Sequence, residues 1–134
     1  MKLDLQSTFL LLDTDGDTIE LPVTDDFWQQ LMSGKPADPK IKLLAASEGR
    51  MVSAYEMTDD WDHWENHPAG DEVLVVLEGA MTLILEEGSE ERLIELTAGK
   101  TAIVPRGVWH TAKVAMPTTL LAITPGQGSG HRPA

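Results

Sequence analysis

Two short stretches of this chain gather residue types that can ligate a metal ion or move a proton. The first reads WDHWENHPAGDE and occupies residues 61–72. In an extended strand, residues two apart share a face. Glu65 and His67 are therefore expected to point the same way, and His63 joins them if the strand is straight. Glu72 opens the strand after the intervening turn and can face back toward His67.

The second stretch reads GKTAIVPRGVWH, residues 99–110, and ends in His110. A barrel can bring its strand beside the first stretch, which would place two carboxylates and two or more imidazoles on one inner surface. Without an ion the two carboxylates repel, so we expect the pKa of Glu65 or Glu72 to rise. Because metal ligands must be deprotonated, the cluster also predicts a metal affinity that weakens in acid.

Several nearby residues are candidates for lining a small-molecule pocket. Arg106 lies in the turn before His110 and can hold a carboxylate through two hydrogen bonds, although turn arginines are more commonly exposed. Tyr55 and Met81 belong to neighbouring strands, where core packing is the more ordinary role. The candidate pocket residues are His63, Trp61, Arg106, Tyr55 and Met81.

Strand patterns dominate the chain. Turn-forming residues separate short apolar runs at a spacing of about ten residues, which indicates a sandwich or a closed barrel. The acidic run 13–17 resembles the start of a calcium loop but lacks its glycine and its final glutamate, so we interpret it as a hairpin turn. The expected strands are 7–12, 18–21, 40–47, 50–58, 73–77, 81–85, 92–96, 101–105 and 118–124.

The strand 73–77 reads VLVVL and is apolar on both faces. A strand with one wet face would alternate, so either the N-terminal segment or a partner subunit is expected to cover its outer side. We therefore expect a homodimer.

One helix is expected between Thr24, which can cap it, and Gly34, which can end it. Residues 1–125 are expected to form a single domain. The remaining tail, 126–134, reads GQGSGHRPA after Pro125 and is expected to be mobile. His131 counts as a tail residue unless the tail folds across the barrel opening.

Composition excludes several classes of function. The net charge of −12 argues against nucleic acid and anionic membranes as partners. No apolar run is long enough to span a bilayer, and we recognise no signal peptide, so a cytoplasmic protein is expected. The absence of cysteine excludes disulfides, thiolate ligands and a cysteine nucleophile. No Gly-x-Ser-x-Gly or phosphate-binding glycine loop is present.

The two stretches resemble the two-part signature of the cupin superfamily. Its first part is His-x-His, four residues, Glu, six residues, Gly; its second is Gly, five residues, Pro-x-Gly, two residues, His, three residues, Asn. The corresponding residues here are Glu65, His67, Glu72 and Gly79, then Gly99, Pro105, Gly107, His110 and Val114. The signature lies within residues 61–114, and the resemblance covers about residues 40–125.

This resemblance implies an all-β fold, the double-stranded β-helix or jelly-roll barrel, with one short N-terminal helix. It also implies one divalent ion, which we expect to be iron, manganese, nickel or zinc. The ligands carried over by position are Glu65, His67, Glu72 and His110. Glu65 stands where the family has its first histidine, and Val114 stands at a mostly structural asparagine.

The glutamate changes the charge of such a site. Two carboxylates cancel the charge of a divalent ion, whereas one leaves a net positive charge, so bound water should be less acidic. Carboxylates also favour manganese and iron(II). Two alternatives stay open. In the first, His63 binds the metal in place of Glu65, and Glu65 supports it without touching the ion. In the second, the metal has been lost and the imidazoles hydrogen-bond to the carboxylates.

The resemblance implies a metal-dependent enzyme with dioxygenase, isomerase or lyase-like chemistry on a small organic substrate. In that case Glu72 or Glu65 is the candidate catalytic residue and moves a proton. The alternative is a non-catalytic module that binds a small ligand or senses a metal. Fold alone does not choose between them.

Overall fold

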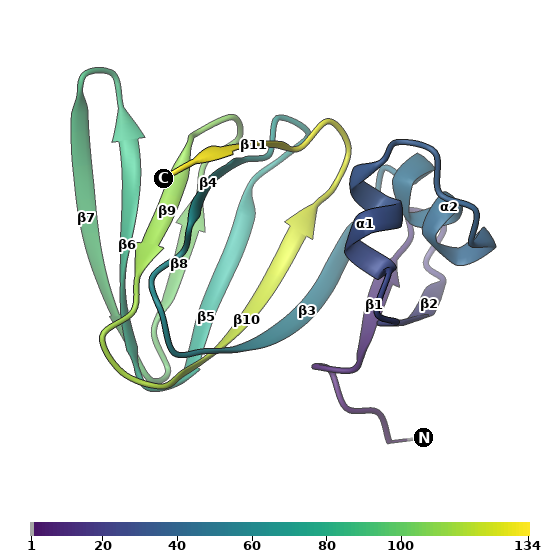
Figure 1. Cartoon of the computed structure of the whole chain (residues 1–134), viewed down its shortest axis with the longest axis horizontal. Coiled ribbons are helices and arrows are strands. Elements are labelled where there is room, and N and C mark those ends of the chain that lie inside the picture. The colour runs from purple at the N-terminus through teal and green to yellow at the C-terminus, as the bar shows by residue number, and fades with distance from the viewer. Residues whose placement is uncertain (1) are drawn as a thin grey trace.

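The structure is a computed structural model and describes residues 2–134. Strands make up about half of it, and two short helices lie near the N-terminus (Figure 1). No helix in the described part is long and apolar enough to cross a membrane. The elements are β1 (Thr8–Leu12), β2 (Thr18–Pro22), α1 (Phe27–Met32), α2 (Pro39–Ala46), β3 (Arg50–Met57), β4 (His63–Asn66), β5 (Glu72–Glu78), β6 (Ala80–Glu87), β7 (Glu90–Thr97), β8 (Thr101–Val104), β9 (His110–Lys113), β10 (Thr118–Pro125) and β11 (Gly130–Pro133).

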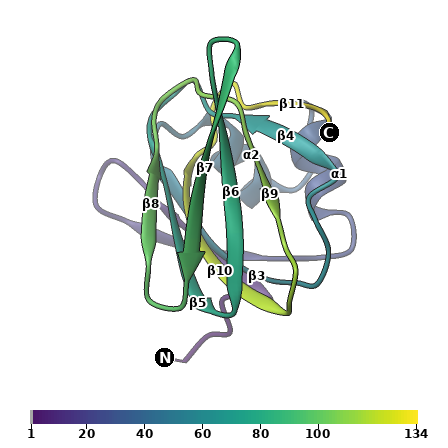
Figure 2. The ribbon, with the colours of Figure 1, turned by 90° about the vertical axis from the view of Figure 1, so that its left-hand side faces the viewer.

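The strands form two antiparallel sheets. The first sheet has the order β2-β1-β3-β10-β5-β8, and the second has the order β11-β4-β9-β6-β7. In Figure 2, β8 of the first sheet stands beside β7 of the second, which closes the two sheets into a barrel on that side. This confirms the expected all-β, double-stranded β-helix.

A main core lies between the two sheets and draws side chains from both. Leu74 and Val76 of β5 alternate inward from the first sheet, and Leu83 of β6 faces them from the second. All three are almost completely buried. Burying such side chains contributes about 1.5–3 kcal/mol each, and the same alternation turns Glu72 at the start of β5 inward.

The N-terminal segment packs at the far side of β3 around a smaller core of its own (Figure 1). The hairpin expected at residues 13–17 is confirmed, because β1 and β2 pair on either side of it. The strand expected at 40–47 is wrong, since this segment is helix α2. Asp38 caps that helix by accepting from the backbone N–H groups of Lys40 and Ile41, and Pro39 at its first position favours the helix.

Helix α1 confirms the expected helix, but its cap differs. Asp26, not Thr24, is the N-cap residue, and its side chain makes no capping hydrogen bond. The Thr24 hydroxyl instead donates to the Asp26 carboxylate. The expectation that Thr24 caps the helix is therefore wrong, because its side chain is engaged by a neighbouring acid.

The outer face of β5 remains partly open to solvent. Leu77 is 48% exposed, and Ile103 on neighbouring β8 is 62% exposed. The N-terminal segment therefore does not cover this face within residues 2–134, and a partner subunit remains the prediction for it.

The C-terminal tail is ordered as strand β11, which corrects the expectation that it is mobile. It pairs with β4 and places His131 opposite Glu65. Arg132 anchors the strand through three contacts. Its guanidinium lies 5.0 Å from the ring centre of Trp64 and 4.6 Å from that of Trp109. It also forms an ion pair with Glu86. Guanidinium–aromatic contacts of this kind stabilise by about 0.5–2 kcal/mol.

Candidate functional site

Three strands bring the four candidate ligands together between the sheets. Glu65 belongs to β4 and pairs in register with His110, the first residue of β9. His67 follows β4, and Glu72 opens β5 on the opposite sheet. One donor atom from each residue lies within 4.8 Å of the others. The expectation that these two carboxylates and two imidazoles meet is borne out geometrically.

The donor atoms converge closely. His110 Nε2 lies 2.9 Å from Glu72 Oε1 and 3.6 Å from Glu65 Oε2. His67 Nε2 lies 3.3 Å from Glu72 Oε2 and 3.5 Å from Glu65 Oε2. Glu72, His67 and His110 are buried, whereas the Glu65 side chain is 21% exposed. The group is thus open to solvent mainly on the Glu65 side.

Hydrogen bonds behind each imidazole set which nitrogen faces the group. His110 Nδ1 lies 3.1 Å from the carbonyl oxygen of Val108, which can only accept, so Nδ1 carries the proton. His67 Nδ1 lies 2.8 Å from the Ser129 hydroxyl, which is in reach of the Pro125 carbonyl as its own acceptor. In the neutral rings both Nδ1 atoms therefore donate away from the group and both Nε2 lone pairs face into it, and metal-ligating histidines likewise donate from the nitrogen that does not bind the ion.

Protonation satisfies this arrangement when no ion is bound. Burial lowers the pKa of His67 and of His110, but contacts with Glu65 and Glu72 outweigh it and raise both to about 9. Burial likewise favours a raised pKa for each carboxyl, yet the imidazoles outweigh it and hold both below their usual range. The expected rise in a carboxylate pKa is therefore wrong, since the imidazoles neutralise the repulsion.

The residues present fit a divalent metal ion. His67 Nε2 is buried and faces carboxylate oxygens at 3.3 and 3.5 Å, but it makes no hydrogen bond of good geometry among residues 2–134, and buried polar atoms without one are rare. Two carboxylates and two imidazoles are also an accepted donor set for first-row divalent ions. Thr124 donates to Glu72 Oε2 at 2.6 Å and orients that carboxylate from behind. These four residues form a candidate metal-binding group.

His63 does not enter this group. Its Nε2 lies 2.9 Å from Glu65 Oε1, the oxygen of Glu65 that faces away from the buried imidazoles. Trp61 stacks on the His63 ring at a centroid distance of 5.5 Å and lies 6.1 Å from the ring of His110. Trp61 and His63 therefore lie beside the group, and their role as pocket residues stays a prediction.

Two other expected pocket residues, Tyr55 and Arg106, have contacts outside the group of candidate ligands. Tyr55 packs with its ring 5.6 Å from that of Phe9, between the main core and the N-terminal core. Arg106 is exposed, and its backbone N–H donates to Asp71. These positions match the ordinary roles of a core tyrosine and a turn arginine.

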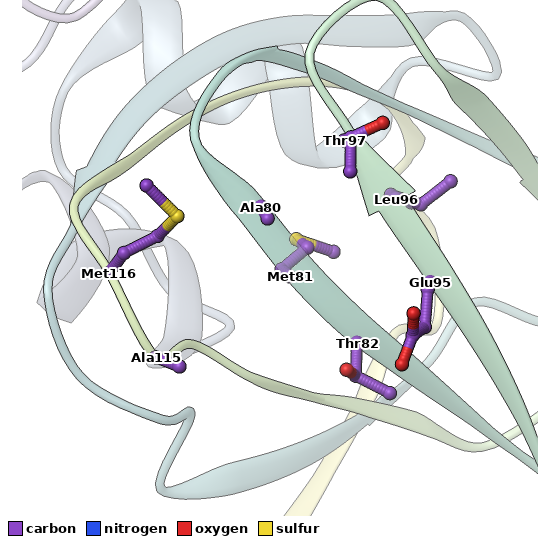
Figure 3. Close-up of a pocket in the computed structure, with 8 residues that line it drawn as sticks. All are labelled: Ala80, Met81, Thr82, Glu95, Leu96, Thr97, Ala115 and Met116. Carbon is purple, nitrogen blue, oxygen red and sulfur yellow. The ribbon is translucent and has the colours of Figure 1, made fainter.

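Met81 lies toward the far end of the barrel from the candidate ligands. His110 pairs with Leu85, four residues further along β6, which corresponds to roughly 13 Å. Met81 instead lines a small hollow with Leu96 and Met116 (Figure 3). Its volume of roughly 180 Å³ is below the 300–1,000 Å³ of ordinary ligand pockets. The structure therefore does not bring Met81 to the site.

Thr124 and Ser129 escaped the sequence analysis, whereas His131 was expected to be a tail residue unless the tail folds across the barrel opening. Thr124 and Ser129 orient Glu72 and His67, and His131 approaches Glu65 from β11. Inward alternation along β10 was a usable signal for Thr124. No local pattern marks Ser129, because its contact with His67 joins positions 62 residues apart.

Comparison with known families identifies the architecture. A family described as the cupin domain matches residues 56–124, just over half of the chain. The chain belongs to the cupin family. The match includes all four candidate ligands of this cupin, while β1, β2 and both helices lie outside it. A search of curated proteins finds no match.

Solved structures share the fold at low sequence identity. A cupin-2 domain containing protein from Shewanella frigidimarina is 24% identical over 57% of this cupin and 70% of its own chain, with a TM-score of 0.49. Hydroquinone 1,2-dioxygenase from Sphingomonas is 15% identical over 56% and 58%, with a TM-score of 0.51. Hydroxypropylphosphonic acid epoxidase from S. wedmorenis is 23% identical over 57% and 42%, with a TM-score of 0.45. The likeness concerns the fold.

Proposed function

We propose that this cupin is a metal-dependent enzyme acting on a small organic substrate, with Glu65, His67, Glu72 and His110 as the ligands of one divalent ion. The observation that carries the proposal is the convergence of two buried imidazole Nε2 atoms and two carboxylates, with His67 Nε2 making no hydrogen bond of good geometry among residues 2–134. Iron, manganese, nickel and zinc all accept this donor set, and its two carboxylates favour manganese and iron(II).

The two carboxylates differ in burial, and we assign them different roles on that ground. Glu72 is buried and fixed by Thr124, so it serves best as a constant ligand and orienting group. Glu65 is partly exposed and contacts imidazoles on both of its oxygens, so, when it is not held by an ion, it is the better placed residue to move a proton to or from a substrate. When bound, the ion would supply a Lewis acid that polarises a substrate oxygen.

Access favours substrates that approach over Glu65 and beside Trp61. The indole of Trp61 stacks face to face on His63, with an interplanar angle of 5°. It offers an apolar wall to a flat or compact substrate that presents oxygen atoms to the group. The reaction class is dioxygenation, isomerisation or lyase chemistry, which this family's architecture accommodates.

A second candidate function is non-catalytic binding of a small ligand or sensing of a metal ion. The observation that favours it is the charge of the donor set: two carboxylates leave a divalent ion without net charge and weaken it as a Lewis acid. A sensor or carrier needs only reversible binding and does not depend on that acidity.

Cobalt(II) substitution separates the two functions. Its optical spectrum reports ligands that reach the metal, so a set of small catechols, hydroquinones, hydroxy acids and diketones can be screened against the cobalt protein. Compounds that change the spectrum are then incubated with iron(II)- or manganese(II)-loaded protein and followed by mass spectrometry. We expect conversion in wild-type protein and none in His110→Ala, with Asp59→Asn as the control. Ligands that bind but stay unchanged with every metal would contradict the enzyme proposal and support the binding module.

A further inference from the structure

A second cluster of ligating side chains lies beside the first and shares Glu65 with it. His63, Glu65 and His131 each offer one donor atom, and these atoms lie within 4.8 Å of one another. Both histidines approach Oε1 of Glu65, with Nε2 at 2.9 Å for His63 and 3.9 Å for His131. The buried imidazoles approach Oε2 instead. Glu65 thus presents one oxygen to each cluster.

His63 is oriented as a ligand from behind. Its Nδ1 lies 2.8 Å from Oδ1 of Asp62, so the ring donates its Nδ1 proton to that carboxylate. In the neutral ring the Nε2 lone pair then faces Glu65 Oε1, which is an acceptor too. A carboxylate behind an imidazole is a common support for metal-bound histidine, and the stacked Trp61 holds the plane of the ring.

His131 reaches the cluster because it lies on strand β11. Strand β11 pairs with β4 in a register that sets His131 opposite Glu65. The next residue, Arg132, stabilises the strand by packing its guanidinium on Trp64 and Trp109 and by an ion pair with Glu86. Several contacts therefore hold the His131 imidazole close to Glu65, a carboxylate that already has His63 beside it.

We propose that His63, Glu65 and His131 form a second, outer site for a divalent ion, with Glu65 as a bridging carboxylate between the two sites. The donor set of two imidazoles and one carboxylate is one that zinc and iron(II) accept with coordination positions left open. The His63 and His131 side chains are 35% and 33% exposed, so the outer ion would be open to water. This inference goes beyond the proposed function, and the two share only Glu65.

Ion stoichiometry tests the outer site. The full chain is stripped with a chelator, exchanged into volatile buffer and titrated with Zn²⁺, and bound ions are counted by native mass spectrometry. We expect about two ions in wild-type protein and about one each in His131→Ala and His67→Ala. Asp59→Asn, which removes an exposed carboxylate outside both clusters, is the control and should match wild type. Circular dichroism checks that each variant folds.

The outcomes distinguish this inference from the proposed function. Equal counts in wild type and His131→Ala would overturn the outer site and leave the inner one standing. A count that falls in His131→Ala but not in His67→Ala would support the outer site and contradict the inner ligand set. Arg132→Ala should also weaken the outer ion, because it loosens β11, while the inner ion stays.

Manganese(II) tests the bridge itself. Two Mn²⁺ ions joined by one carboxylate couple magnetically, so the electron paramagnetic resonance signal per ion should fall as the second ion binds. His131→Ala, with the inner ion alone, should give the full signal of an isolated ion. Two bound ions with uncoupled signals in wild-type protein would overturn the bridging role of Glu65.

Discussion

At the scale of single residues, the candidate ligands can be neutralised in two ways, by protons on the imidazoles or by a bound cation. The same geometry serves both, because each Nε2 faces a carboxylate and needs a proton or a cation between them. Protons and a metal ion therefore compete for His67 and His110, and the raised pKa values of these histidines make that competition measurable.

Metal binding should expel protons. In the metal-free protein both imidazoles have a pKa of about 9, so at neutral pH they are protonated and must lose about two protons to ligate. Zinc affinity should accordingly rise with pH and level off above pH 9. Calorimetry in buffers of different ionisation enthalpy counts the protons released, and a binding enthalpy independent of buffer would contradict the expected protonation.

The stability of metal-free protein should fall in alkali. A histidine whose folded pKa is about 9 and whose ordinary value is 6.5 contributes stability that is complete below pH 6.5. That contribution is lost as the pH rises through 9. Urea unfolding of stripped protein across this range should show the loss, and His110→Ala should reduce it. A flat profile in stripped wild-type protein would be inconsistent with the ion pairs.

At the scale of elements, the turn at Gly79 carries the chain from β5 in the first sheet to β6 in the second, and the registers of these two strands aim Glu72 and His110 inward. Gly79 makes that turn with φ of +85°, and an added Cβ would lie 2.3 Å from the backbone oxygen of Pro117. Gly88, in the hairpin between β6 and β7, also has positive φ but has open space around it. The two glycines therefore separate backbone strain from steric contact.

Gly79→Ala should cost more stability than Gly88→Ala. Both variants carry the left-handed penalty of about 1–2 kcal/mol. Gly79→Ala adds a backbone clash, which costs about 1–3 kcal/mol more. The free energies of unfolding from urea titration give the comparison directly. Equal losses would show that the turn moves away from Pro117 without cost.

Elements differ in how far the sequence predicted them. The inner cluster could be predicted because alternation in strands and the paired motif spacing act over short distances, as Glu65 and His67 show. Helix α2 could not be recognised from its apolar run, although Asp38 followed by proline was a helix-start signal. Strand β11 was beyond such reasoning, because Arg132 and His131 are held by contacts with a distant part of the chain.

At the scale of the whole molecule, the open apolar face of the first sheet predicts a homodimer. Its outward side chains alternate with the core residues and stay partly exposed: Val73, Val75, Leu77, Ile103, Leu121 and Ile123. Covering such a patch removes apolar area from water.

The cupin family matches residues 56–124. That the single domain extends over residues 1–125 therefore stays a prediction.

Light scattering with surface variants tests the dimer. We expect wild-type protein at micromolar concentration to be dimeric and Ile103→Lys to be monomeric, because the charge would be buried in the interface. Leu93→Lys is the matched control, since Leu93 is 61% exposed but belongs to the second sheet. A monomeric wild-type protein would exclude this interface.

The central claim is that Glu65, His67, Glu72 and His110 hold one ion, and elemental analysis tests it most directly. The His131→Ala protein, purified without tag, added metal or chelator, isolates the inner site from the outer one. The account predicts close to one divalent ion per chain, lost when His110→Ala is added and retained when His63→Ala is added. Full occupancy in the His110→Ala variant, or a folded His131→Ala protein that no added ion can load, would contradict it.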